Sequence, residues 1–242
     1  MFLNGAKLAC RHATRIVTDA AEMRRLYREK FGMDSACIAY GANLVHPRDP
    51  DCVRKLGLEP GRYFFCAGRL IPDNNAALIV EAFRKVEGDW KLAVAGEADY
   101  RGNRKELEYK ELLKKLADGR VVFLGHVNDR AVFDELLCNC FAYVHGHEYG
   151  GTNPSLLQAL GAGCMILALD TPFSAEVLDN GKYGRLFAKN PGALGAEMRK
   201  LCGNLESTLE YRGMARTRIE EQYSWDKITD QYEALLDEVR RA

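Results

Sequence analysis

Residues 144–163 read VHGHEYGGTNPSLLQALGAG, and this stretch decides how the rest of the chain is interpreted. An apolar, strand-like run leads into a glycine-rich turn and then directly into a helical pattern. Glycines let a backbone approach a ligand closely, and short polar side chains cap helices or bind oxygen atoms. The turn carries both kinds of residue, at Gly146, Gly150, Gly151, Thr152, Asn153 and Ser155.

Pro154 suits the first turn of the following helix, where the N–H that it lacks would have no partner. The free N–H groups that follow would then point at a ligand in front of the helix, so a diphosphate would fit there. An ordinary capped strand-to-helix turn explains the same residues equally well, because glycine-rich loops match by chance. Other segments must decide between the two interpretations.

The composition is that of a soluble globular protein, with 47% hydrophobic and 28% charged residues among 242. Lysine plus arginine equal aspartate plus glutamate at 34 each, so no overall field favours nucleic acid as a partner. No apolar run reaches membrane-spanning length, and the first residues lack the hydrophobic centre of a secretory signal. These features predict a cytoplasmic protein that binds no nucleic acid.

The eight cysteines are interpreted as reduced thiols, because several lie in apolar, strand-like runs where cysteine acts as a small core residue. They are Cys10, Cys37, Cys52, Cys66, Cys138, Cys140, Cys164 and Cys202. The pair at 138 and 140 has no second pair at the spacing of a zinc site. No metal site is therefore predicted.

Short strand-like runs alternate with helical patterns over about half of the chain. The runs cover 62–68, 91–96, 120–125, 140–146 and 164–169, and the helical patterns cover 75–86, 105–116, 131–137 and 155–160. This order predicts an α/β fold with a Rossmann-like, doubly wound parallel sheet whose strands are buried on both faces.

Four of these strands end in glycine, at Gly68, Gly96, Gly125 and Gly146. Open parallel sheets bind ligands outside the carboxyl ends of their strands. The polar residues that follow these glycines are therefore the candidate site.

The two ends of the chain differ from its middle. Residues 1–34 hold a strand-like run at 14–19 and a basic helical stretch at 20–32, which are too short to form a domain. We interpret 1–34 as the remnant of another domain or as a junction, and 35–242 as one domain with terminal helices. The region from 191 is helical, and its final helix at 225–241 carries an apolar stripe of Ile228, Tyr232, Leu235, Leu236 and Val239.

Five segments in this order resemble the C-terminal, nucleotide-sugar-binding half of retaining glycosyltransferases of the family-4 type, which have the GT-B fold. They are IAYGANL at 38–44, AGRLIPDNNAALIVEAF at 67–83, VVFLGHVND at 121–129, GGTNPSLLQALGAG at 150–163 and YSWDKITDQYEALL at 223–236. The resemblance covers roughly residues 36–240. HGHEYGGTNPSLLQAL looks most like the loop of bacterial polysaccharide rhamnosyltransferases.

The resemblance implies that an arginine and a lysine after the first strand hold the donor diphosphate, together with amides of the later loop. Arg69, next to Gly68, matches the arginine, and its guanidinium suits two phosphate oxygens. Without the resemblance, a surface ion pair would be the simpler interpretation of Arg69. The lysine position falls on Asn74 or Asn75, so one cation is lost. Arg69, the helix amides and a group from another domain would then have to stabilise the charge of the leaving group.

The family also has two glutamates at the spacing E-x7-E, and this chain has Gly150 and Gln158 there. The carbonyl oxygen of Gln158 can still accept hydrogen bonds from ribose hydroxyls, without charge. Glu148 lies two residues before the first position and is, with Arg69, a candidate catalytic residue. It would partly substitute for the lost glutamate without acting as a base, and an exposed loop carboxylate is the alternative.

Further substrate-binding residues follow from the strand ends. His145 and His147 should lie on one face of the fourth strand, either as packed structural histidines or as partners of the sugar or a phosphate. The resemblance implies that the nucleotide base meets the backbone near His126 and Val127. The remaining candidates line the loop and the start of its helix, at Gly150, Gly151, Thr152, Asn153, Pro154, Ser155 and Leu156.

The expected function is retaining transfer of a hexosyl or deoxyhexosyl group, with rhamnosyl as the finer expectation. The donor would be a UDP-, dTDP- or GDP-sugar, and the acceptor a polysaccharide or a lipid-linked glycan at the inner face of the membrane, with peripheral contact. No cofactor or metal is expected, because positioning and charge stabilisation supply the catalysis. A chain of this length holds only one of two GT-B halves, so an N-terminal acceptor domain or partner chain would be needed for transfer.

Two alternatives stay open. A non-catalytic nucleotide-sugar-binding or regulatory module would keep the fold and tolerate the lysine-to-asparagine and glutamate-to-glutamine departures. A nucleotide-sugar epimerase is less favoured, because its two-domain landmarks are not evident.

Overall fold

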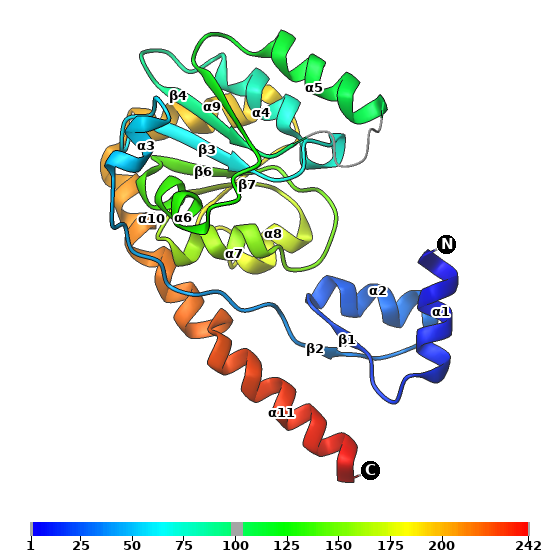
Figure 1. The fold of residues 1–242 in the computed structure, drawn as a ribbon. Helices are drawn as coiled ribbons and strands as arrows, with labels where there is room; N and C mark the ends of the chain where they lie inside the picture. The colour runs from blue at the N-terminus through cyan, green and yellow to red at the C-terminus, as the bar shows by residue number, and fades with distance from the viewer. Residues whose placement is uncertain (1, 98–103, 242) are drawn as a thin grey trace.

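The structure, a computed structural model, describes residues 2–97 and 104–241 of the chain (Figure 1). Its centre is a six-stranded parallel sheet with the strand order β5-β4-β3-β6-β7-β8. The strands are β3 (Tyr63–Ala67), β4 (Lys91–Ala95), β5 (Val121–Gly125), β6 (Ala142–His145), β7 (Ile166–Leu169) and β8 (Arg185–Phe187). The order reverses between β3 and β6, which is where ligands bind in sheets of this kind.

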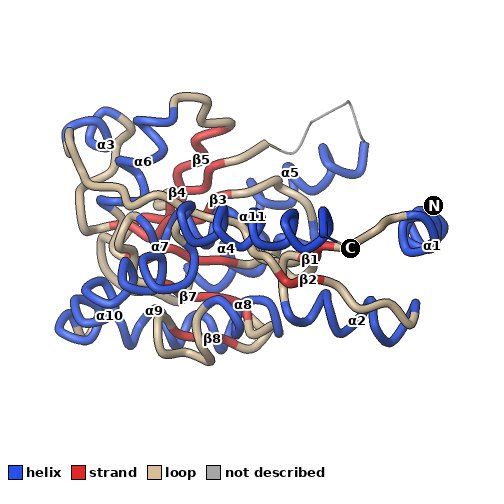
Figure 2. The backbone as a smooth tube through the Cα atoms, turned by 90° about the horizontal axis from the view of Figure 1, so that it is seen from below, coloured by secondary structure: helices blue, strands red, loops and turns tan. Residues whose placement is uncertain are grey.

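Helices cover both faces of the sheet (Figures 1 and 2). One layer consists of α4 (Ala76–Phe83), α5 (Arg104–Leu116) and α9 (Pro191–Cys202). The other contains α3 (Asp51–Lys55), α6 (Arg130–Asn139), α7 (Pro154–Gly161) and α8 (Pro172–Val177). Helix α10 (Leu205–Arg218) contacts both α7 and α9, and so joins the two layers.

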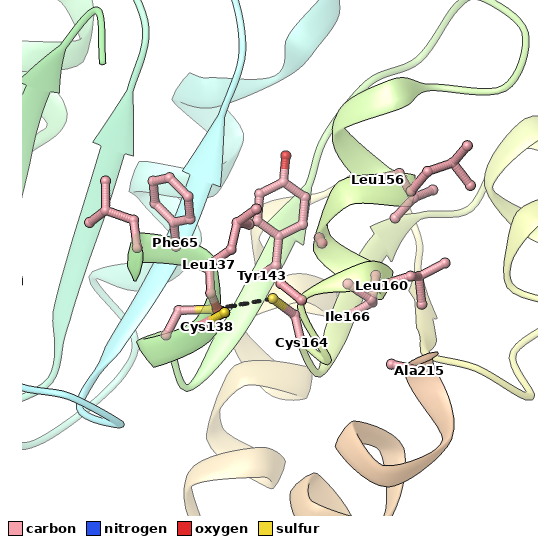
Figure 3. Close-up of a cluster of buried hydrophobic side chains, with 14 of the residues drawn as sticks. Phe65, Leu137, Cys138, Tyr143, Leu156, Leu160, Cys164, Ile166 and Ala215 are labelled. Atoms are coloured by element: carbon pink, nitrogen blue, oxygen red, sulfur yellow. Dashed lines mark hydrogen bonds between the residues drawn. The ribbon is translucent and has the colours of Figure 1, made fainter. Parts of the chain in front are cut away.

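Strand alternation divides the core into two clusters, one on each face. Phe64 of β3 packs with the α4 and α9 side, whereas the next residue, Phe65, packs with the α6 and α7 side. Figure 3 shows the second cluster, in which Tyr143 and Ile166 of the sheet lie beside Leu156 of α7. All eight cysteines are free thiols, and four of them are buried.

The strands and helices predicted between residues 62 and 169 are confirmed, as is the helical C-terminal region. The prediction that all strands are buried on both faces is wrong for β5, because it is an edge strand whose Phe123 is 38% exposed. The sequence analysis also missed β8 and the helix α1 (Phe2–His12).

An N-terminal unit lies beside the sheet domain in Figure 1. It contains α1, β1 (Val17–Thr18), α2 (Ala21–Phe31) and β2 (Ala36–Cys37), and β1 pairs in parallel with β2. The strand and helix predicted at 14–32 are confirmed. A domain boundary at residue 34 stays a prediction.

An extended strap, residues 38–50, connects this unit to α3. The amide of Ala42 donates to the Tyr223 carbonyl at 2.8 Å, and that of Val45 to the Gly161 carbonyl at 2.9 Å. Tyr223 ends a short π-helical segment, η2 (Ile219–Tyr223), which precedes α11 (Trp225–Arg241). Helix α11 extends away from the sheet domain in Figure 1. No helix of the described residues is both long and apolar enough to cross a bilayer.

Candidate functional site

The loops after β3 and β6 meet at the carboxyl edge of the sheet, because these strands are neighbours. A Cβ at Gly68, whose φ is 155°, would lie 2.9 Å from the Cε1 atom of His147. A Cβ at Gly146 would lie 2.5 Å from the carbonyl oxygen of Asn74. Glycine is therefore required at both positions so that the two loops can pack together.

Arg69 follows Gly68 in this loop and forms no ion pair within residues 2–97 and 104–241. Its positive charge acts on His147, which places the two side chains close together. The surface ion pair considered above as an alternative is therefore not found among the described residues. A role for Arg69 in binding a diphosphate stays a prediction.

Asn74 and Asn75 both act as structural links at the position where the family has its lysine. The Nδ2 atom of Asn74, in the turn η1 (Pro72–Asn74), donates to the Arg69 carbonyl at 2.7 Å. Asn75 has the left-handed φ of 56°, and its Nδ2 atom donates to the Gly146 carbonyl at 2.8 Å. These bonds fix the shape of the loop but supply no charge.

His145 and His147 lie on the same face, as alternation predicts, with stacked rings whose centroids are 4.7 Å apart. His145 is only 2% exposed, and its Nδ1 atom has no hydrogen-bond partner within the described part of the chain. Burial and the nearby charge of Arg69 lower the pKa of His147 to about 4. Burial, with a smaller effect of His147, also lowers the pKa of His145. Both imidazoles are therefore neutral at pH 7.

Glu148 is held by two contacts that sequence reasoning did not find. Its amide donates to the Asp73 carbonyl at 3.1 Å, and its carboxylate pairs with the ammonium of Lys189. The hydrogen bond from Lys189 lowers the pKa of Glu148. The carboxylate is therefore ionised and neutralised by a lysine 41 residues away, a separation that leaves no local sequence signal. Its catalytic role stays a prediction.

The start of α7 has the cap that the sequence predicts. Asn153 accepts a hydrogen bond from the Ser155 amide at 3.0 Å, and Pro154 occupies the first helical position. Leu156 is 1% exposed and belongs to the core, and its role in substrate binding stays a prediction.

The N-terminal unit contacts the glycine-rich loop, and no local pattern in the sequence predicts this contact. The Thr152 hydroxyl donates to the Asp19 carbonyl, and the Asp19 carboxylate lies where a Cβ of Gly151 would be. The Ala21 amide donates to the Glu176 carboxylate of α8, at 2.9 Å and 3.0 Å to its two oxygens. The turn between β1 and α2 is thus fastened to the sheet domain on two elements.

A cavity of about 1020 Å³ lies between the strap, α7 and the starts of α6 and α11. Gln158 of α7, Arg130 of α6 and Arg48 of the strap line it. His126 and Val127 precede α6, whose first turn is capped by the Asp129 carboxylate at 2.8 Å from the Ala131 amide. Within the described residues, no three His, Cys, Asp or Glu side chains gather as a metal site.

Solved structures confirm the fold. The chain is similar to sucrose-phosphate synthase from Thermosynechococcus elongatus, with a TM-score of 0.85 at 17% identity, over 99% of this chain and 61% of that one. It is also similar to Anabaena HepE in complex with UDP-glucose, with a TM-score of 0.86 at 16% identity, over 98% of this chain and 67% of that one. The sheet domain therefore has the architecture of the expected GT-B half.

Two curated relatives match this chain at low sequence identity. An N-acetylgalactosamine-N,N'-diacetylbacillosaminyl-diphospho-undecaprenol 4-alpha-N-acetylgalactosaminyltransferase from Campylobacter jejuni is 23% identical over 72% of this chain and 46% of its own length. A probable sucrose-phosphate synthase from Thermosipho melanesiensis is 22% identical over 81% of this chain and 45% of its own length. The chain thus spans about half the length of the curated relatives it matches.

The sequence model of the family described as glycosyl transferases group 1 matches residues 51–218, which is more than half of the chain. The matched region runs from α3 to the end of α10 and includes every strand of the six-stranded sheet. The chain belongs to the group 1 glycosyl transferase family.

Proposed function

We propose that the chain binds the nucleotide diphosphate sugar donor of a retaining glycosyltransferase. The observation that carries this proposal is Arg69, which is free of any ion pair among the described residues and stands at the carboxyl edge beside His147. A guanidinium in this position, together with the amides at the start of α7, forms a positive site for a diphosphate.

The donor would lie along the carboxyl edge of the sheet. Its nucleoside would occupy the 1020 Å³ cavity, where Gln158 can accept hydrogen bonds from the ribose. The diphosphate would lie at β3 and β6, between Arg69 and the glycine-rich loop. The sugar would then continue towards β7, where the loop approaches α8.

Catalysis in such a site would rest on positioning and on stabilising the charge of the departing diphosphate. Arg69 and the α7 amides would carry this charge, and neutral His147 would donate one hydrogen bond. A second, acceptor-binding half would bring the hydroxyl that attacks the sugar. That half and a lipid-linked or polysaccharide acceptor at the inner face of the membrane are part of the proposal. The Campylobacter relative, a transferase named for a diphospho-undecaprenol substrate, supports a lipid-linked acceptor, and the Anabaena structure in complex with UDP-glucose supports a nucleotide sugar donor.

The donor sugar is proposed to be a hexose or deoxyhexose. The loop sequence HGHEYGGTNPSLLQAL supports rhamnose as the finer choice, on resemblance.

Isothermal titration of the purified chain with UDP, dTDP and GDP tests the proposal. One nucleotide should bind saturably, and Arg69→Ala should weaken it by about 10- to 100-fold, because hydrogen bonds to charged groups are strong. Gln158→Ala should weaken it by about 2- to 10-fold. Arg62→Ala is the matched control, because Arg62 precedes the opposite end of β3 and pairs with Asp89. Failure of every nucleotide to bind, or an undiminished affinity in Arg69→Ala, would overturn the proposal.

A non-catalytic binding module is the second candidate. The use of Asn74 and Asn75 as structural links, and the pairing of Glu148 with Lys189, favour it, because they leave few groups for chemistry. Transfer of a radiolabelled sugar from the bound nucleotide in the presence of an acceptor-binding half would exclude it.

A further inference from the structure

A small polar recess lies between the loop at 147–153 and the start of α8. Leu156 and Phe173 are among its apolar residues, and its polar residues are His145, His147, Glu148, Tyr149, Asn153, Thr171 and Ser174. Its volume of about 10 Å³ is close to the minimum that holds one water molecule. The recess therefore has room for a single hydroxyl-sized group.

The polar group that lacks a partner here is the Nδ1 atom of His145. The side chain is 98% buried, since only 2% is exposed, and no described residue makes a hydrogen bond to Nδ1. A buried polar atom without a partner is costly and calls for an explanation. A neutral imidazole nitrogen either donates or accepts, depending on the tautomer, and a hydroxyl group can satisfy either one.

The recess carries no net charge. His145 and His147 are both neutral at pH 7, and the Glu148 carboxylate is paired with Lys189. The Thr171 hydroxyl is engaged, because it donates to Ser174 Oγ at 3.2 Å and accepts from the Ser174 amide at 3.1 Å. An uncharged hydroxyl suits this environment, whereas the carboxylate of a uronic acid would lose its hydration without gaining a cation.

The position of the recess indicates that it would receive the sugar of the donor, and not the nucleoside or the diphosphate. The nucleoside cavity lies on the α6 side of Gln158, and Arg69 marks the diphosphate at β3 and β6. The recess lies between the ends of β6 and β7, and so further along the order β3-β6-β7 than Arg69, because His145 ends β6 and Thr171 follows β7. Neighbouring strands are about 4.8 Å apart, so the next group of the donor along this edge is the sugar.

We propose that the recess receives one hydroxyl group of the donor sugar, that His145 Nδ1 is its hydrogen-bond partner, and that His145 thereby determines which neutral sugar is bound. This inference rests on the proposed function. The ring of His145 also stacks on the ring of His147, so a test must separate the effect of the hydrogen bond from that of packing.

His145→Phe separates the two, because phenyl keeps an aromatic ring under His147 and removes the nitrogen. The probes are the nucleotide diphosphate that binds the wild type and its sugar conjugates, with glucose, galactose and the 2-, 3-, 4- and 6-deoxy analogues of glucose. We expect unchanged affinity for the free nucleotide and a loss of about 2- to 10-fold for the best sugar conjugate. One deoxy analogue should bind the wild type and His145→Phe equally.

Tyr143→Phe is the matched control, because it removes a hydroxyl group from the same strand that donates to the Ala67 carbonyl instead of facing the recess. It should leave the preference among sugar conjugates unchanged. Equal losses for the free nucleotide and its sugar conjugates in His145→Phe would show that the recess holds a structural water, and would overturn the inference.

A measurement on the wild type guards against a variant that fails to fold. The chain has five histidines, so the side-chain nitrogen signals can be resolved by NMR. The Nδ1 signal of His145 should shift when the sugar conjugate is added and stay in place with the free nucleotide. An equal shift with both would overturn the inference. Binding of no nucleotide by the wild type would instead overturn the proposed function, and this inference with it.

Discussion

Lowering the pH tests whether the fold holds His147 neutral. Burial and Arg69 lower the pKa of His147 from 6.5 to about 4. The unfolded chain binds a proton near pH 6.5, whereas the folded chain resists protonation until near pH 4. The contribution to stability is therefore complete above pH 6.5 and is lost as the pH falls towards 4. The loss amounts to about 1 kcal/mol at pH 6, about 2 kcal/mol at pH 5 and about 3 kcal/mol at pH 4.

Urea unfolding of the wild type and of His147→Gln, measured between pH 7 and pH 4, isolates this effect. The free energy of unfolding of the wild type, relative to that of the variant, should fall by about 3 kcal/mol over the range. His12→Gln, at an exposed position of α1, is the control and should follow the wild type. A wild-type to His147→Gln difference that stays constant within about 0.5 kcal/mol would refute the conclusion that His147 is buried neutral beside Arg69.

Three further predictions concern contacts around the site. Gly151→Ala should displace the Asp19 carboxylate, which lies where the new Cβ would be. Amide hydrogen exchange at residues 18–22 should then become faster, and unchanged exchange would contradict the contact. Lys189→Ala should raise the pKa of Glu148 towards its ordinary value, as carboxyl carbon NMR would show. An unchanged pKa would contradict the ion pair. Glu135→Ala should lower the free energy of unfolding by about 2 to 4 kcal/mol. Glu135 is only 6% exposed, and its carboxylate accepts hydrogen bonds from two backbone amides and one side-chain amide. Denaturant unfolding measures the loss, and a loss below about 1 kcal/mol would contradict this role of Glu135.

Local patterns in the sequence predicted the parts of the fold that local physics determines. The apolar runs that end in glycine are strands, and the order Asn153, Pro154, Ser155 is the helix cap that its residue types favour. Strand β8 was missed because its three residues are too few to show a period. Helix α1 was missed because its sequence, FLNGAKLACRH, contains a glycine and has no acidic residue in its first turn to mark a helix start.

Contacts between distant residues could not be predicted, because no spacing within a single sequence marks them. Thr152 and Asp19 are 133 residues apart, and Lys189 and Glu148 are 41 residues apart. The identity of the lysine position was uncertain for a related reason. The structure shows that Asn74 and Asn75 link two loops, which a single sequence cannot reveal.

The hydrogen bonds of the β1 to α2 turn couple the N-terminal unit energetically to the glycine-rich loop and to α8. The Thr152 hydroxyl and the Glu176 carboxylate each hold one side of the turn, so a ligand that moves the glycine-rich loop must carry the turn along or break a hydrogen bond. Breaking it costs about 1 kcal/mol, roughly a fivefold change in an equilibrium constant. Linkage is reciprocal, so whatever repositions the N-terminal unit alters the affinity of the loop for its ligand by the same factor. Residues 17–21 thus link the position of the N-terminal unit to the occupancy of the loop.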